Sequence, residues 1–145
     1  MTPFIQLYRH DPENGLIGDC YHTVIACLLD VSPETVPHVY GTETGGEQRD
    51  AMDEFLRRRG YALISMGYPG TMSLDEVLSC ASQFSPGVHF LLSGTSPRGT
   101  CHVVIARDGR IVHDTHPDAM DTDFSASLVG PYDGGWRLEF IGARV

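Results

Sequence analysis

The chain has 145 residues, of which 41% are hydrophobic, and this length and content suit one compact domain over residues 1–145. Its 19 acidic and 10 basic residues give a net charge of −9, which argues against nucleic acid as the main partner, because the sequence shows no Lys/Arg patch that could neutralise the phosphates of a nucleic-acid backbone. No apolar run approaches the roughly 20 residues that span a bilayer, and the start lacks the basic and then apolar regions of a secretion signal. We therefore expect no membrane contact. The four cysteines form no CxxC pair, so we expect reduced thiols and a cytoplasmic location.

The first half of the chain predicts helices separated by turns. Asp19 is a suitable N-cap, and the apolar residues after it recur at helical spacing as far as Leu28. Ser73 and Glu76 have the spacing of a capping box, which predicts a further helix from Leu74. Between these helices we expect a short turn at 32–36, a polar loop at 41–46, a helix that covers 51–56 and ends at Gly60, and a strand at 61–66.

The second half has the composition of strands joined by turns. Helices first and strands afterwards predict an α+β domain with an antiparallel sheet. Two longer loops, 93–100 and 116–135, are candidates to line a site, because long loops in compact domains often do so. The expected strands cover 88–92, 101–107, 110–114 and 136–141.

Cys20 is the candidate nucleophile because it falls on the first turn of the helix predicted after Asp19. A thiol there lies among unpaired backbone N–H groups at the positive end of the helix dipole, and both favour the thiolate that attacks carbonyl carbon. The helical stripe that it shares with Cys27 leaves a second interpretation open, in which Cys20 is a small buried apolar residue. We interpret Cys27, Cys80 and Cys101 as core thiols.

His102 and Asp114 are the candidate base and the carboxylate that orients it. Each has an ordinary interpretation when taken alone, as a packed histidine and as a residue at the end of a strand. Together with Cys20 they give a nucleophile, a base and an orienting group in chain order on suitable elements. This combination favours nucleophilic catalysis.

The turn between the strands at 101–107 and 110–114 decides whether the imidazole meets the carboxylate. A two-residue turn, Asp108-Gly109, sets Arg107 against Arg110 and places His102 and Asp114 on opposite faces of the hairpin. A loop one residue longer, which adds Arg107 to the turn, sets His102 opposite Asp114, with Cβ atoms about 4.5–5.5 Å apart. Because the shorter turn opposes two like charges, we favour the three-residue loop.

Gln6 is the candidate oxyanion donor. A side-chain amide upstream of a cysteine nucleophile can join the Cys20 backbone N–H in stabilising a tetrahedral oxyanion. The alternative interpretation is an ordinary surface glutamine on an N-terminal strand.

A metal site is an alternative for the histidines of the second half. His113, His116 and Asp118, joined by His102, are ligand types that suit zinc or manganese. The chain has no HExxH or HxHxD pattern, however, and we expect neither a metal nor another cofactor.

Several short motifs are shared with a known superfamily: Gln6, Gly18-Asp19-Cys20 followed by Ile25-Ala26-Cys27-Leu28-Leu29, Val36-Pro37-His38, Gly99-Thr100-Cys101-His102-Val103-Val104, and Val112-His113-Asp114. On these motifs the chain resembles the papain-like cysteine peptidases, and among them the compact bacterial and phage-type members, from Gln6 to about Pro117. The resemblance implies a papain-like α+β domain in which an N-terminal helix carries the nucleophile and packs on an antiparallel sheet. It also implies a nucleophile at Cys20, a base at His102, an orienting group at Asp114 and an oxyanion donor at Gln6.

The expected function is that of a thiol hydrolase acting on an amide, peptide or isopeptide carbonyl of a peptide, protein or small amide substrate. Hydrolysis, acyl transfer and deamidation share the acyl-enzyme intermediate, so the sequence does not separate them. A catalytically silent protein that binds or sequesters a ligand on the same fold is the first alternative, and a His/Asp metal hydrolase is the second. The sequence gives no oligomeric state.

Overall fold

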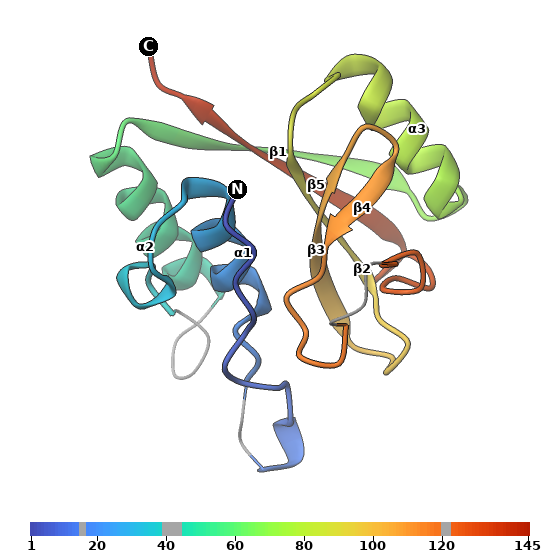
Figure 1. Cartoon of the computed structure of the whole chain (residues 1–145), viewed down its shortest axis with the longest axis horizontal. Helices are drawn as coiled ribbons and strands as arrows, with labels where there is room; N and C mark the ends of the chain where they lie inside the picture. The colour runs from blue at the N-terminus through green and yellow to red at the C-terminus, as the bar shows by residue number, and fades with distance from the viewer. Residues whose placement is uncertain (15–16, 39–44, 120–122) are drawn as a thin grey trace. The chain divides into compact units, whose positions relative to one another are not determined.

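The structure is a computed structural model that describes residues 1–14, 17–38, 45–119 and 123–145. Over these residues the chain is an α+β protein with a five-stranded antiparallel sheet, as the order of its helices and strands predicted (Figure 1). The papain-like arrangement stays a prediction. The helices are α1 (Cys20–Leu29), α2 (Gly45–Arg58) and α3 (Leu74–Phe84), with 3-10 helices η1 (Pro12–Asn14) and η2 (Pro33–Thr35). The strands are β1 (Tyr61–Pro69), β2 (Phe90–Thr95), β3 (Cys101–Arg107), β4 (Arg110–His113) and β5 (Gly135–Ala143).

The contacts between residues divide the chain into two compact units. The first contains Met1–Ile64, Thr115–Pro117 and Ile141–Val145, and the second contains Ser65–Asp114 and Asp118–Phe140. The single domain expected over 1–145 stays a prediction.

In the first unit, α1 is enclosed by packing and the N-terminal segment is bonded to it. Residues 22–27 of α1 are all buried, and six consecutive residues cover every side of a helix. The backbone N–H of Thr2 donates to Cys27 O at 3.1 Å, and that of Phe4 donates to the Cys27 sulfur at 3.3 Å. The helix ends at Asp30, whose φ of +54° is left-handed and whose carboxylate accepts from the Thr2 hydroxyl.

The other predicted elements of the first unit are present with shifted bounds. The short turn predicted at 32–36 is η2. The predicted loop at 41–46 lies outside the described residues as far as 44, and α2 begins at Gly45. The chain turns from α2 into β1 at Gly60, whose φ of +78° suits a residue without a side chain.

In the second unit, α3 packs on one face of the sheet (Figure 1). The capping box predicted for this helix is confirmed, because Glu76 N–H donates to Ser73 Oγ at 3.2 Å and Ser73 N–H donates to the Glu76 carboxylate at 2.7 Å. Alternate residues of three strands face the helix, as the period of two in a strand requires. The core so formed contains Val77, Leu78 and Ala81 of α3 with Phe90, Leu92, Val104, Ala106, Trp136 and Leu138 of the sheet.

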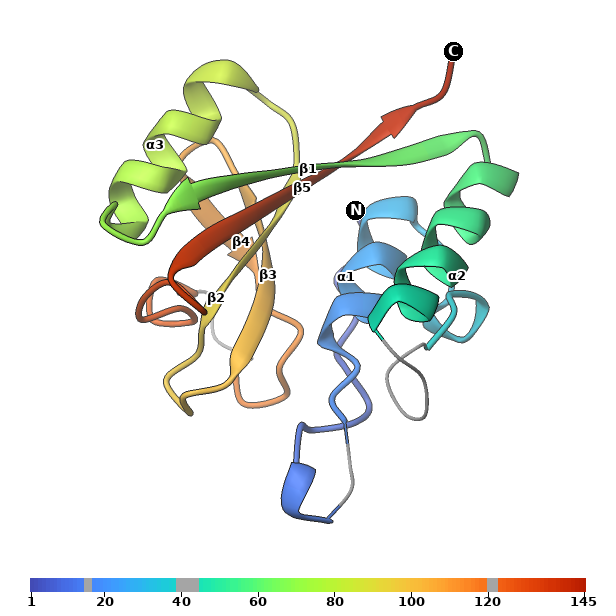
Figure 2. The ribbon, with the colours of Figure 1, turned by 180° about the vertical axis from the view of Figure 1, so that it is seen from behind.

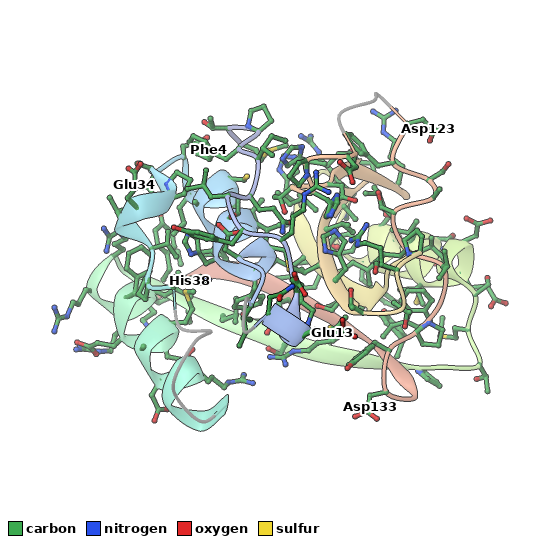
Figure 3. The ribbon with its side chains drawn as sticks, turned by 90° about the horizontal axis from the view of Figure 1, so that it is seen from below. Phe4, Glu13, Glu34, His38, Asp123 and Asp133 are labelled. Carbon is green, nitrogen blue, oxygen red and sulfur yellow. The ribbon has the colours of Figure 1, made fainter. Side chains whose placement is uncertain are left out.

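The strand order of the sheet is β1-β5-β2-β3-β4, so the last strand of the chain lies between the first and the second. β1 and β5 run side by side in both ribbon views (Figures 1 and 2). β2 continues to Thr95, beyond the end predicted for it, and the loop predicted at 93–100 is shorter in consequence. The turn before β5 contains Asp133 (Figure 3) and Gly134. Both residues have positive φ.

The hairpin between β3 and β4 corrects the predicted turn. Arg107 pairs with Arg110, so the connection is the two-residue turn Asp108-Gly109, with φ values of +49° and +81°, and the favoured three-residue loop is wrong. Two residues with positive φ form the turn whose twist matches that of antiparallel strands, and this local preference outweighs the repulsion between the two arginines. Beyond the turn the register shifts by one residue, from Ala106 opposite Ile111 to Ile105 opposite His113.

Of the three cysteines predicted to be core thiols, only Cys27 is buried, and the prediction is wrong for Cys80 and Cys101. Cys27 is buried, and burial raises the pKa of its thiol to about 11. Cys80 is only half-buried, where its sulfur accepts from the Tyr68 hydroxyl at 3.4 Å, and Cys101 is exposed. Cys101 forms the last pair of its ladder, opposite Thr95, and this place at the margin of the sheet accounts for its exposure.

Among the described residues, no helix combines the length and the apolar character needed to cross a bilayer.

Candidate active site

Cys20 is the first residue of α1 and is partly exposed, so it is not the buried apolar residue of the alternative interpretation. The helix therefore places the thiol where the prediction put it, among the N–H groups of the first turn. Asp19 occupies the predicted N-cap position of α1, but its side chain makes no capping bond to the first turn.

The Asp19 carboxylate instead holds the N-terminal segment. It is 1% exposed and accepts from the backbone N–H groups of Leu7 at 3.1 Å and Tyr8 at 2.9 Å. The Asp19 N–H in turn donates to Tyr8 O at 3.4 Å. A buried carboxylate needs such donors, and here they bind residues 7–8 to the start of α1.

Gln6 is buried, at 5% exposure, and is not a surface glutamine. Its Nε2 donates to Tyr8 O at 2.7 Å, and its Oε1 accepts from the Thr115 hydroxyl at 3.3 Å. Tyr8 O also accepts from Asp19 N–H, so the Gln6 amide nitrogen and the Asp19 nitrogen lie within about 6 Å of each other. The amide of Gln6 is thus held at the residue before Cys20.

Thr115 holds Gln6 in place, a role that the sequence analysis did not predict. Its carbonyl oxygen accepts from Gln6 N–H at 2.8 Å, and its buried hydroxyl donates to the same residue's side chain. The two residues are 109 positions apart, and no periodicity or motif indicates such a pairing.

His102 and Asp114 form a buried pair in the second unit. His102 Nε2 lies 2.7 Å from Asp114 Oδ1, and each side chain is only 4% exposed. Because an ionised carboxylate only accepts, this bond places the hydrogen of a neutral imidazole on Nε2. The predicted meeting of the two residues is therefore confirmed.

The meeting has a different cause from the one predicted. Continuing the register beyond Ile105 and His113 sets Asp114 opposite Val104, which lies on the same face of β3 as His102. A shift of one residue exchanges the two faces of a strand, so the bulge reverses the effect of the shorter turn. The carboxylate reaches the imidazole as a diagonal neighbour rather than as a direct partner.

Two further histidines of the first unit, His22 and His38, pack against each other. His22 is buried on α1, and among the described residues neither of its ring nitrogens has a hydrogen-bond partner. Its ring meets that of His38, which is labelled in Figure 3, edge-on at 5.1 Å between ring centres. His38 in turn stacks on Tyr8 at 5.9 Å. Burial lowers the pKa of His22, the neighbouring His38 lowers it further, and Asp19 acts in the opposite direction.

The residues considered for a metal do not assemble. Within the described ranges, no group of three or more His, Cys, Asp or Glu side chains could hold a metal ion. His113 instead packs edge-on against Phe124 at 6.0 Å between ring centres.

The four candidate residues fall into two sets. Cys20 and Gln6 belong to the first unit, whereas His102 and Asp114 belong to the second.

Comparisons with protein-family models, with curated proteins and with solved structures found no match to this chain.

Proposed function

We propose that this chain is a papain-like thiol hydrolase that acts on an amide, peptide or isopeptide carbonyl. The observation that carries the proposal is the buried bond of 2.7 Å between His102 and Asp114. A carboxylate bonded to one nitrogen of an imidazole fixes the tautomer and stabilises the imidazolium that forms when the ring takes up a proton. The substrate class is a peptide, a protein or a small amide.

The proposed reaction uses the second nitrogen of the imidazole. With Nε2 engaged by Asp114, the His102 Nδ1 accepts the proton of the Cys20 thiol, and the thiolate attacks the carbonyl carbon. The tetrahedral intermediate collapses as the imidazolium returns that proton to the leaving amine, which leaves a thioester on Cys20. Water, deprotonated by the same imidazole, hydrolyses the thioester and restores the thiol.

The oxyanion is assigned to the Cys20 backbone N–H and the Gln6 side chain. An amide nitrogen carries two hydrogens, so its donation to Tyr8 O leaves a second hydrogen for the oxyanion. The bonds from Tyr8 and Thr115 hold this amide in place, and fixed donors stabilise developing charge better than mobile ones. The reaction needs no cofactor, and its free thiol suits a reducing cytoplasm, where we place the protein.

Competition among the four cysteines tests the proposal without knowledge of the substrate. Cys101 is exposed, so an ordinary thiol at Cys20 would be alkylated by iodoacetamide no faster than Cys101. We expect Cys20 to react at least about tenfold faster than Cys101 at pH 6. In the proposed mechanism His102 accepts the proton of Cys20, and the thiolate, not the thiol, attacks iodoacetamide. Mass spectrometry of the alkylated peptides measures both rates in one sample.

Two variants control this measurement. Cys101→Ala should leave the rate at Cys20 unchanged, and Cys20→Ala should remove the fast reaction while the thermal unfolding of the protein stays nearly the same. Equal rates at Cys20 and Cys101 over pH 6–9 would contradict the proposed mechanism.

The second candidate function is a binding protein of the same fold without catalysis. It is favoured by the internal bonds of Gln6, because both ends of its amide already have partners and its burial needs no oxyanion. This candidate expects ordinary reactivity at Cys20, so the same competition experiment separates the two functions.

A further inference from the structure

Three side chains that carry or can carry positive charge form a row across the sheet of the second unit. Arg107 of β3 lies directly opposite Arg110 of β4. Phe90 pairs with Ala106, and continuing this register by one residue sets His89 beside Arg107. Neighbours across antiparallel strands have Cβ atoms about 4.5–5.5 Å apart, so His89, Arg107 and Arg110 are adjacent on one face.

A shallow pocket lies over this row. Its volume is about 280 Å³, and its lining is His89, Arg107, Asp108, Arg110 and Val112. The guanidinium of Arg107 and the side chain of Arg110 are both accessible there, at the turn end of the hairpin.

The two arginines of this row carry an electrostatic cost that the one acidic residue of the pocket lining, Asp108, only partly offsets. Like charges directly opposite each other on a sheet are destabilising. Asp108 supplies one carboxylate, which accepts from Gly87 N–H at 2.7 Å and from Arg107 Nε at 3.1 Å. These bonds and the two arginines lower the pKa of Asp108, so it stays ionised. Within the pocket lining, this one negative charge stands against two arginines.

We propose that the row of His89, Arg107 and Arg110 binds a phosphate group. Each guanidinium presents a planar fork of N–H donors that matches two oxygens of an oxyanion. A carboxylate has two oxygens and satisfies one fork, whereas a phosphate has enough oxygens for both. Its negative charge is also opposite in sign to the net positive charge that the two arginines and Asp108 leave in the pocket.

The site is distinct from the buried pair of His102 and Asp114. Arg107 is five residues from His102 along β3, which is roughly 16 Å at the rise of an extended strand. The phosphate site does not depend on the thiol chemistry, so it can hold or fail whatever the outcome at Cys20.

Thermal unfolding of the full chain tests the proposal with inorganic phosphate as the probe. We expect phosphate at about five times its Kd to raise the Tm by about 3–5 °C over sodium chloride of the same ionic strength. Acetate at that ionic strength should not raise the Tm. O-phosphoserine distinguishes the source of the group, since a shift equal to that of phosphate assigns the site to phosphoryl groups on larger molecules, and a smaller shift assigns it to the free ion.

Arg110→Gln gives a second, independent readout. It should raise the Tm in chloride, because it removes the like-charge contact with Arg107, and it should abolish the shift with phosphate. Arg98→Gln, which removes an exposed arginine elsewhere in the same unit, should do neither. A phosphate shift that persists in Arg110→Gln, an equal shift with acetate, or an Arg110→Gln variant no more stable than the parent in chloride would overturn the proposal.

Discussion

At the scale of single residues, the protonation of His22 makes the free energy of unfolding depend on pH. Its ring is buried, and in the described part of the chain its two nitrogens lack hydrogen-bond partners, so the folded state disfavours the charged imidazolium. The pKa of His22 in the folded protein therefore lies below the ordinary value of 6.5. As pH falls below about 6.5 the unfolded chain binds a proton that the folded chain does not, and the free energy of unfolding decreases.

His22→Phe should remove this sensitivity to acid. A phenyl ring fills a similar volume without unpaired nitrogens, so we expect the free energy of unfolding at pH 7.5 to change by less than about 1 kcal/mol. Between pH 6.5 and 5.5 the variant should lose less stability than the parent, as urea unfolding at each pH measures. His38→Gln should reduce the acid effect only in part, because burial is the larger cause of the shift. Parallel losses in parent and His22→Phe would contradict this account.

The candidate site shows which residue roles the sequence could predict. Cys20 was found because helix periodicity and a turn before the helix are local signals. The bonds of the Asp19 carboxylate could not be predicted, because the residues that donate to it, Leu7 and Tyr8, are distant in sequence and belong to no recognisable motif. Capping residues are the same residue types that bind backbone N–H groups elsewhere, so composition alone did not separate the two roles.

At the scale of elements, the β3–β4 hairpin shows how two errors cancelled. The prediction weighed the repulsion of Arg107 and Arg110 above the twist preference of the two-residue turn, and the structure has the opposite balance. The prediction also assumed an unbroken ladder, whereas a bulge follows the turn. A bulge carries no glycine or proline signal here, so the face of Asp114 could not be derived from the sequence.

Gly94→Ala should destabilise the pairing of β2 with β3. Gly94 lies opposite His102, and a Cβ added there would meet Trp136 Cζ3 at 2.7 Å and Gly130 O at 2.8 Å. Because a ring in the core and a backbone oxygen must both move, we expect a loss of about 1–3 kcal/mol in the free energy of unfolding.

Gly130→Ala is the matched control for this substitution. A Cβ at Gly130 meets nothing within 4 Å, so chemical denaturation should give a change within about 0.5 kcal/mol. Similar losses in the two variants would show that the close approach at Gly94 is not the cause.

At the scale of the whole molecule, the proposed chemistry takes its nucleophile from the first unit and its base from the second. His102→Gln should lower the alkylation rate of Cys20 at pH 6 by at least about tenfold, because the proton of the thiol loses its acceptor. The rate at Cys101 should not change. Peptide mass spectrometry over a time course gives both rates.

His113→Gln is the control for a change of histidine in the second unit. His113 is buried on the neighbouring strand β4, so its replacement perturbs the sheet without removing the base. We expect the Cys20 rate of this variant to equal that of the parent. If both variants slow Cys20 alike, the effect arises from the fold and not from proton transfer.

The strand order could not be derived from the sequence, although the fold class could. The composition of each segment indicates a strand or a helix, and this was sufficient to predict an α+β domain. That β5 lies between β1 and β2 depends on pairing between segments far apart in the chain, and their alternating residues would fit several partners equally well.

Trp136 gives this molecule a built-in optical reporter. It is the single tryptophan of the chain, it is 2% exposed, and its indole N–H donates to Met72 O at 2.9 Å within the second unit. Its fluorescence therefore follows the loosening of the α3-covered sheet, whereas circular dichroism at 222 nm also records α1 and α2. Comparing the two signals along one denaturation curve reveals whether the halves of the polypeptide melt together or in succession.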